Sequence, residues 1–396
     1  MFNSNSRFRK ARSRFARTWT IAVSAAVATA CGSDRPDADA GIDVAIADAT
    51  RDVPVIDAVD DAPAPSQCPL AIEHAEDIGP LAMPAFILGR DGGHSLALAG
   101  RLLWTFGDTF LSGHAADGDN VRSATAAWGG YADPLAIVEP LDAVGAPLQL
   151  IPYTDAEAEA NRTDPQNGWA LWAGSAVDDG SGDAMVIFQT IRRVAGGGFP
   201  SQGVGVAHVH PYATTATRDP GLLFAPPEPL FGASGAFNDG EYVYLMACET
   251  IGFFNVGCRL ARAPQREASR RASYRYFDGA QWNSELSSSV IVVDHAGGMS
   301  VSFNAHLGCY LGVHNQPLSS TIVLRTARRP EGPWSTPLAT LSDPAVVLPP
   351  LQMGYDYGAK EHPALATGNG QDIVLGYSRP LTPFRGEVRL IRVHLR

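Results

Sequence analysis

The feature that most constrains this fold is a recurring pattern of short apolar strands separated by turn residues. From residue 80 onward, runs such as Ala184–Thr190, Tyr242–Ala247 and Thr321–Ala327 alternate with turns, and groups of runs recur at spacings of about fifty residues. One small sheet cannot bury both of its faces, whereas blades stacked around an axis bury them against each other. The pattern therefore predicts an all-β fold, a five-bladed β-propeller. A two-layer β-sandwich is the alternative.

The composition agrees with a turn-rich β protein. The chain of 396 residues contains 40 Gly and 29 Pro, and 45% of its residues are hydrophobic, which is enough for a large core. No sustained helical period is visible after residue 80. Because all-β propellers often use more than 250 residues as one unit, we expect a single domain over residues 68–396.

The first 30 residues read as a lipoprotein signal peptide. Six basic residues and no acid precede a short apolar stretch, Trp19–Ala28, which is too short to span a bilayer comfortably. The stretch ends in Ala-Thr-Ala-Cys-Gly-Ser, which resembles a lipobox with Cys31 as the acylated residue. Ordinary cleavage after Ala30, releasing a soluble protein, is the alternative. We expect a cell-envelope protein, lipid-anchored to the outer membrane or secreted.

Residues 31–67 are predicted to be a disordered tether rich in Asp, Ala and Pro. They hold nine aspartates and too little apolar surface to offset the entropy of ordering. Removing residues 1–30 takes the formal net charge from −11 to −17, because six basic residues leave with the signal. An acidic protein of this kind is unsuited to nucleic acid. We expect a monomer that meets a membrane only through its lipid anchor.

Four cysteines remain in the folded part, and none has the paired spacing of a zinc site. Cys248 and Cys258 lie at the two ends of a short segment, where neighbouring strands of one hairpin would bring them within bridging distance. Two buried free thiols are the alternative reading.

Several motifs along residues 83–396 resemble one family in their order. Gly89–Ser95 followed by Leu103–Phe110 resembles the opening blade of the bacterial propellers known as domain of unknown function 4185. Further similar stretches are Ala272–Gly279 before Trp282, Ser300–Asn304 before Leu307–Tyr310, Arg325–Ala327 before Gly332–Ser335, and Glu361–Pro363. That family includes endo-D-arabinanases of glycoside hydrolase family 183. The resemblance implies a propeller that acts on a polysaccharide, with arabinan as the first candidate.

Two aspartates of the first blade suit glycoside hydrolysis, which needs one protonated and one ionised carboxyl group at the scissile bond. Asp91 lies in a glycine-flanked turn, and Asp108 follows Gly107 at the end of an apolar strand. Two close carboxylates push their pKa values apart, which supplies an acid and a base at one pH. We predict Asp91 and Asp108 as the catalytic pair. Each could instead be a turn residue bound to its own backbone.

Six further polar residues are predicted to contact substrate because they lie near a matched motif or at a strand end. Ordinary loop or structural roles are the alternative for each of them, and this is the better reading for Glu249. The six are His94, Asn304, His306, Glu361, His362 and Glu249.

No nucleophile elbow, phosphate loop, dinucleotide fingerprint or H-E-x-x-H run occurs in the chain, so we expect no cofactor and no catalytic metal. A structural calcium in the central channel is compatible with the sequence, since oxygen ligands leave no spacing signature. The sequence therefore favours a glycoside hydrolase. A non-catalytic propeller that binds glycans or a protein is the alternative, because a fold does not imply an activity.

Overall fold

The computed structural model describes residues 68–252 and 255–396. The predicted signal peptide (1–30), the lipidated Cys31 and the predicted tether (31–67) lie outside the described residues. No helix in the described ranges is long and apolar enough to cross a membrane.

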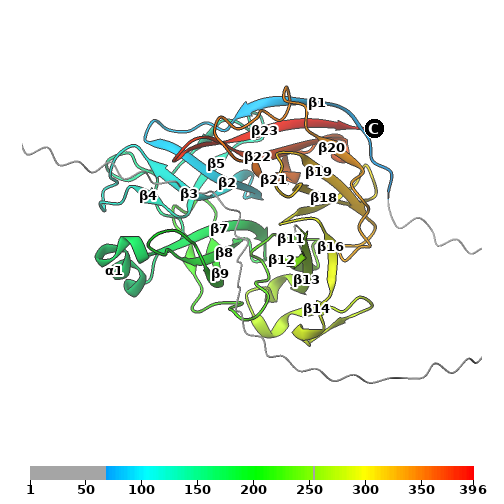
Figure 1. The fold of residues 1–396 in the computed structure, drawn as a ribbon, viewed down its shortest axis with the longest axis horizontal. Coiled ribbons are helices and arrows are strands. Elements are labelled where there is room, and N and C mark those ends of the chain that lie inside the picture. The colour runs from blue at the N-terminus through cyan, green and yellow to red at the C-terminus, as the bar shows by residue number, and fades with distance from the viewer. Residues whose placement is uncertain (1–67, 253–254) are drawn as a thin grey trace, which may run out of the picture.

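The described residues form five antiparallel sheets arranged in a ring (Figure 1), which confirms the predicted five-bladed β-propeller. Blade 1 contains β2 (Ile87–Leu98), β3 (Arg101–Leu111), β5 (Thr125–Gly129) and β6 (Ile137–Val138), with β4 (Val121–Arg122) beside β3. Blade 2 contains β7 (Trp169–Asp178), β8 (Ala184–Arg192), β9 (Ser201–Val209) and β10 (Thr217–Arg218). Blade 3 contains β11 (Ala236–Asn238), β12 (Tyr242–Gly252), β13 (Asn255–Pro264), β14 (Arg275–Phe277) and β15 (Trp282–Asn283), with β16 (Ile291–Asp294) beside β13.

Blade 4 contains β17 (Ser300–Asn304), β18 (Cys309–Asn315), β19 (Ile322–Ala327) and β20 (Ala339–Leu341). Blade 5 contains β21 (Tyr357–Glu361), β22 (Asp372–Thr382), β23 (Arg385–Leu395) and β1 (Ile72–Pro80). The first strand of each sheet lies innermost, since β7 contacts both β2 and β11, and β17 contacts both β11 and β21.

The hydrophobic core is divided into clusters that lie between neighbouring blades. Leu103 of β3 packs with Leu171 and Phe188 of blade 2, whereas the adjacent Leu102 packs with Val374 and other residues of blade 5. Successive side chains of a strand point to opposite faces, so each blade buries one face against each neighbour. This is why the propeller strands read as continuous apolar runs.

The ring is closed by pairing the two ends of the described chain. Strand β1 is the outermost strand of the last blade and pairs antiparallel with the C-terminal β23. Figure 1 shows this blue strand beside the red one. Ion pairs of Arg389 with Asp77 and of Arg392 with Glu76 fasten the two strands.

Two disulfides lie in the described residues. Cys248 of β12 faces Cys258 of β13 and is bonded to it. This confirms the predicted disulfide within one hairpin and excludes two free thiols at these positions. Cys68 is bonded to Cys309 of β18, a pairing that the sequence did not predict. This second bond ties the start of the described chain to blade 4.

The sequence showed no helical period after residue 80, yet one loop of the structure contains a helix. Residues 155–168 contain α1 (Asp155–Thr163), capped by reciprocal bonds between Thr154 and Glu157, and η1 (Pro165–Asn167). Short 3-10 turns complete the described structure: η2 (Gln265–Glu267), η3 (Arg271–Ser273), η4 (Leu286–Ser288), η5 (Pro363–Leu365) and η6 (Gly368–Gly370).

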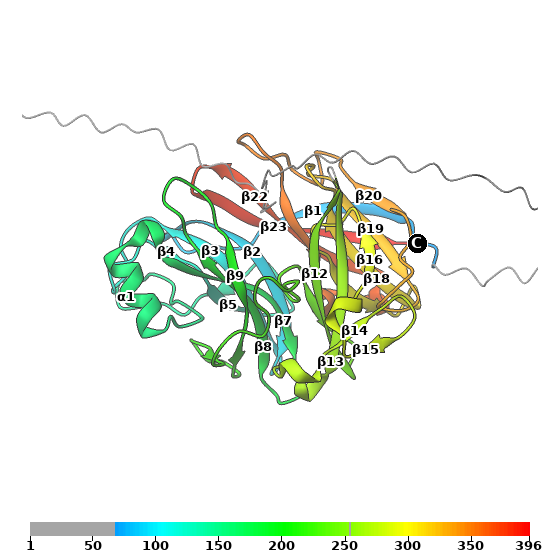
Figure 2. The same cartoon turned by 60° about the horizontal axis from the view of Figure 1, so that its bottom comes forward.

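The blades present two different ends. Figure 2 shows the tips of hairpins β8–β9 and β22–β23 pointing toward the same upper edge of the molecule, and the end of β12 near Gly252 lies toward this edge as well. We call this the upper end. Strands β14 and β15 lie toward the lower edge of the same view.

Candidate functional site

Asp91 lies at an irregularity between the two inner strands of blade 1. Arg90 faces Thr109 and Gly92 faces Phe106, so Asp91 opposes both Gly107 and Asp108. Such a two-against-one bulge bends a strand and redirects its side chains. Gly92, at φ 87°, occupies the left-handed region that favours glycine, which is why the sequence after Asp91 is glycine-rich.

The carboxylate of Asp91 is held by neighbours from two blades. Tyr357 of β21 donates its hydroxyl to Asp91 Oδ2 at 3.0 Å, and the backbone N–H of Asp108 also donates to this carboxylate. A Cβ added to Gly107 would lie 2.6 Å from Asp91 Oδ1, so only glycine leaves room for the carboxylate there. Lys360 donates to the adjacent carbonyl of Gly92 at 2.8 Å.

The electrostatic balance at Asp91 follows from these contacts. Burial raises the pKa of Asp91 above its ordinary value. The Tyr357 hydroxyl and the positive charge of Lys360 oppose this rise because both stabilise the ionised carboxylate. Burial in turn lowers the pKa of Lys360 to about 8.

Asp108 is the second carboxyl group and faces blade 2. Trp172 of β7 donates its indole N–H to Asp108 Oδ1 at 3.0 Å. Burial and the negative charge of Asp91 raise the pKa of Asp108 to about 7, while the charge of Arg193 acts in the opposite direction. Asp91 and Asp108 are both half-buried and so keep contact with solvent. The structure thus brings the predicted pair together as two interacting carboxyl groups.

Two aromatic pairs join loops of the upper end to blades 1 and 2. Trp172 packs against Phe199 of the β8–β9 loop with ring centroids 5.8 Å apart. Phe110 of β3 packs against Phe384, at the tip of β22–β23, with centroids 5.2 Å apart. Phe199 is 42% exposed and Phe384 is 49% exposed, so both present ring surface to solvent at the upper end.

Glu361 ends β21 and faces blade 4. Ser302 of β17 donates to Glu361 Oε2 at 2.5 Å, and the Glu361 N–H donates to Ser300 Oγ at 2.8 Å. The residue is only 7% exposed, and burial raises the pKa of its carboxyl to about 7. Successive side chains of β21 point in opposite directions, Lys360 toward blade 1 and Glu361 toward blade 4. Glu361 therefore lies between blades 4 and 5 and not beside the aspartate pair.

The two predicted histidines near the pair differ in access. His94 of β2 is half-buried, and burial together with the charge of Lys360 lowers its pKa well below the ordinary value. His362 is fully buried, bonded to Ser95 at 2.8 Å and packed on Trp104. The predicted substrate contact of His362 is therefore corrected to a packing role between blades 1 and 5.

Three other predicted contacts lie away from the pair. Asn304 is 3% exposed and bonds Gly370 O and the N–H of Leu307, so it caps the turn after β17 instead of meeting substrate. His306 is exposed in that same turn. Glu249 lies near the β12–β13 tip and forms an ion pair with Arg259 at 2.8 Å. None of these three residues forms part of the site around Asp91 and Asp108.

Several side chains of the site were not predicted. Tyr357, Lys360 and Arg193 act on the pair from other blades, and Phe199 contacts Trp172; nothing in their local sequence marks them. The structure places Trp172 at the site through its bond to Asp108, whereas Trp104 is fully buried in the core. Among the described residues, no group of three or more His, Cys, Asp or Glu side chains is arranged to hold a metal ion.

Residues 212–381 match the family described as Domain of unknown function (DUF4185). This confirms the family resemblance over that segment, which includes Glu361 and His362 but neither Asp91 nor Asp108. No curated protein matches the sequence.

Solved structures resemble the chain at low identity. One is an alpha-L-arabinofuranosidase from Podospora anserina in complex with cellotriose, at 10% identity and TM-score 0.46, covering 83% of this chain and 98% of that one. Another is the GH43_1 enzyme from Xanthomonas citri complexed with xylotriose, at 17% identity and TM-score 0.48, covering 80% of this chain and 90% of that one. A third is the catalytic domain of a GH62 alpha-L-arabinofuranosidase from Coprinopsis cinerea, at 11% identity and TM-score 0.43, covering 83% and 98%.

Proposed function

We propose that this propeller is a glycoside hydrolase whose reacting groups are Asp91 and Asp108. The observation that carries the proposal is the interacting carboxyl pair at the bulge of blade 1, half-buried and open to solvent. Glycosidic bonds are hydrolysed by two such groups in different protonation states.

The surroundings of the two groups suit different roles. Asp91 accepts hydrogen bonds from Tyr357 and from a backbone N–H and lies near the charge of Lys360, which favours its ionised form. Asp108 has a pKa raised to about 7, so at neutral pH and below a large fraction carries a proton. Asp108 then gives its proton to the leaving glycosidic oxygen as the C–O bond breaks. Asp91 activates a water molecule or attacks the anomeric carbon.

The two aromatic pairs at the upper end of the propeller, Trp172 with Phe199 and Phe110 with Phe384, support a saccharide as the ligand there. Exposed faces of Phe199 and Phe384 offer apolar surfaces for the C–H faces of sugar rings, while Trp172 fixes Asp108 by its indole N–H. The family resemblance makes D-arabinan the first polysaccharide to try. We further propose that the protein works in the cell envelope, exported by its N-terminal signal and anchored through Cys31.

The proposal is tested by screening polysaccharides for new reducing ends with the purified protein. Asp91→Asn and Asp108→Asn should each lower the rate by about 10²–10⁴-fold, the usual contribution of acid–base groups. Asp155→Asn on the exposed start of α1 is the matched control and should leave the rate unchanged.

Two results would contradict the proposal. Cleavage that survives both site substitutions would place the chemistry elsewhere. Binding of a polysaccharide without any cleavage would favour a non-catalytic glycan-binding propeller.

A further inference from the structure

A strongly basic segment stands out in this acidic protein. Residues 259–275 contain six arginines and one acid, Glu267, although the whole chain has a net charge of −11. The segment runs from the second half of β13 through η2 and η3 to the start of β14, in blade 3. An isolated positive region on an acidic surface attracts anions.

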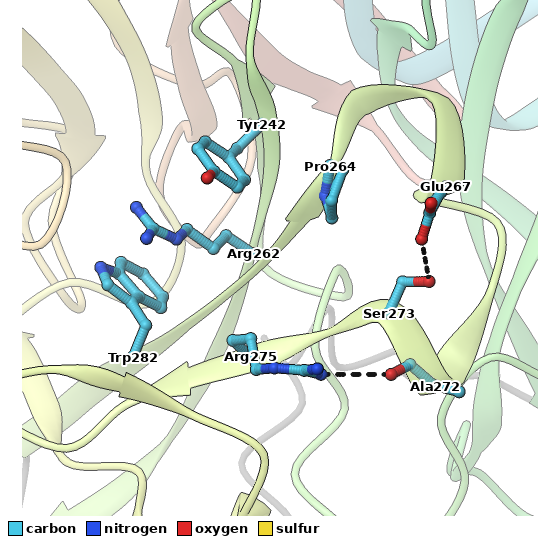
Figure 3. Close-up of a pocket in the computed structure, with 8 residues that line it drawn as sticks. All are labelled: Tyr242, Arg262, Pro264, Glu267, Ala272, Ser273, Arg275 and Trp282. Carbon is cyan, nitrogen blue, oxygen red and sulfur yellow. Dashed lines mark hydrogen bonds between the residues drawn. The ribbon is translucent and has the colours of Figure 1, made fainter.

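A pocket of about 420 Å³ lies on this segment. Its walls include Tyr242, Arg262, Arg275 and Trp282 (Figure 3). Tyr242 faces Pro264 in the β12–β13 ladder, at the end opposite to the hairpin tip, so the pocket lies away from the upper end. It is therefore separate from the site of Asp91.

The central arginine of the pocket is fixed in place. Arg262 lies between the rings of Tyr242 and Trp282, with its guanidinium carbon 4.2 Å and 4.3 Å from their centroids. Figure 3 shows this stacked arrangement. One side-chain hydrogen bond joins Arg262 to the hydroxyl of Tyr244. A guanidinium carries five N–H donors, so one held flat by two rings keeps the remaining donors available to a planar anion and loses little entropy on binding.

Two acids lie near the pocket, and each already accepts hydrogen bonds from its own neighbours. Asp239 accepts the hydroxyl of Tyr244 at 2.8 Å and two backbone N–H groups of its own turn. Glu267 lines the pocket itself, and there it accepts the hydroxyl of Ser273, another lining residue, at 2.7 Å. Within the described part of the chain, no carboxylate forms an ion pair with Arg262 or Arg275.

Two more arginines extend the positive charge beyond the pocket. Arg266 and Arg270 are exposed and, in the ranges that the structure describes, have no carboxylate partner either. By contrast, Arg259 pairs with Glu249 and Arg271 with Glu228. Four of the six arginines in residues 259–275 thus have no carboxylate partner among the described residues, and two of these four, Arg262 and Arg275, line the pocket.

We propose that this pocket binds an acidic saccharide, a sugar that carries a carboxylate such as a uronate residue in a polysaccharide. The guanidinium of Arg262 would donate two N–H groups to the carboxylate in a bidentate pair. Arg275, whose Nη1 is bound to the carbonyls of Ala272 and Tyr274, would add positive charge at the pocket wall. The exposed parts of Tyr242 and Trp282 would contact the sugar ring. A pocket of this volume suits one or a few sugar residues. The site holds the protein on an acidic glycan independently of the chemistry at Asp91.

The test uses calorimetric titration of the full protein with polygalacturonate oligomers and with their neutral methyl esters. The acid oligomers should bind, and added salt should weaken the binding. Arg262→Gln and Arg275→Gln should each weaken it about tenfold, the usual effect of losing a charge-assisted hydrogen bond. Arg162→Gln on exposed α1 removes the same charge far from the pocket and should have no effect.

Arg275 is exposed, so its substitution should fold even if Arg262→Gln does not. Equal binding of the neutral esters, or equal loss in Arg162→Gln and Arg275→Gln, would overturn the proposal. Equal binding of polyglutamate would overturn the saccharide assignment. None of these outcomes depends on whether Asp91 and Asp108 cleave a polysaccharide.

Discussion

At the scale of single residues, one glycine sets the position of Asp91. The absence of a side chain at Gly107 lets the carboxylate lie against the neighbouring strand, where it meets the Asp108 N–H. The backbone of Gly107 has no positive φ, so an alanine there is opposed by the carboxylate alone.

We therefore predict that Gly107→Ala displaces Asp91 and lowers kcat/KM on the cleaved polysaccharide by on the order of 100-fold. The folded state should persist, as followed by circular dichroism. Gly113→Ala is the control, since its added Cβ would meet only Phe86 at an ordinary 3.5 Å. Equal activity of the two variants would show that the position of Asp91 does not matter.

The pKa of Asp108 predicts the alkaline side of the pH profile. As the proposed acid, Asp108 acts only when protonated, so kcat/KM should fall as pH rises through about 7. The charge of Arg193 lowers this pKa, and its removal must raise it. Arg193→Gln should thus move the alkaline limb to higher pH. If the alkaline limb of the Arg193→Gln variant lies at the same pH as that of the unsubstituted protein, Asp108 is not the acid.

At the scale of elements, the two disulfides close very different lengths of chain. Cys68–Cys309 spans 241 residues, whereas Cys248–Cys258 spans 10. In the chain-entropy description, a disulfide that closes a longer loop stabilises the folded state more. The bond Cys68–Cys309 should therefore contribute about 3 kcal/mol more than the bond Cys248–Cys258. The long bond also holds the segment that leads into the closing strand β1.

We predict that the double substitution Cys68→Ser with Cys309→Ser lowers the free energy of unfolding by about 4–5 kcal/mol, measured by denaturant titration. The double substitution Cys248→Ser with Cys258→Ser should cost less. The opposite ranking would mean that closure of the ring does not depend on the bond to Cys68.

The elements also show where the sequence pattern was informative. Strands β2 and β3 follow from apolar runs and turn residues, and so does the hairpin that carries Cys248 and Cys258. Helix α1 was missed because its nine residues carry only one buried side chain, Glu157, which pairs with Arg218. A helix without an apolar stripe leaves no 3.6-residue period to detect.

At the scale of the whole molecule, the ring explains which site residues could be predicted. Asp91 and Asp108 lie on paired strands of one blade, so local sequence suffices to connect them. Tyr357 and Trp172 come from the two neighbouring blades, and only ring closure brings them to the pair. His362 was predicted as a contact because it lies beside a motif, but the interface between blades buries it.

The most direct test of the account is the rate of Asp108→Asn on two substrates of the sugar that is cleaved. One is the natural polymer, and the other is an aryl glycoside whose phenol departs without a proton. The account predicts that Asp108→Asn loses kcat/KM on the polymer but retains most of kcat/KM on the aryl glycoside, whereas Asp91→Asn loses kcat/KM on both. Equal loss on both substrates by Asp108→Asn, or full activity of Asp91→Asn on either, would contradict it.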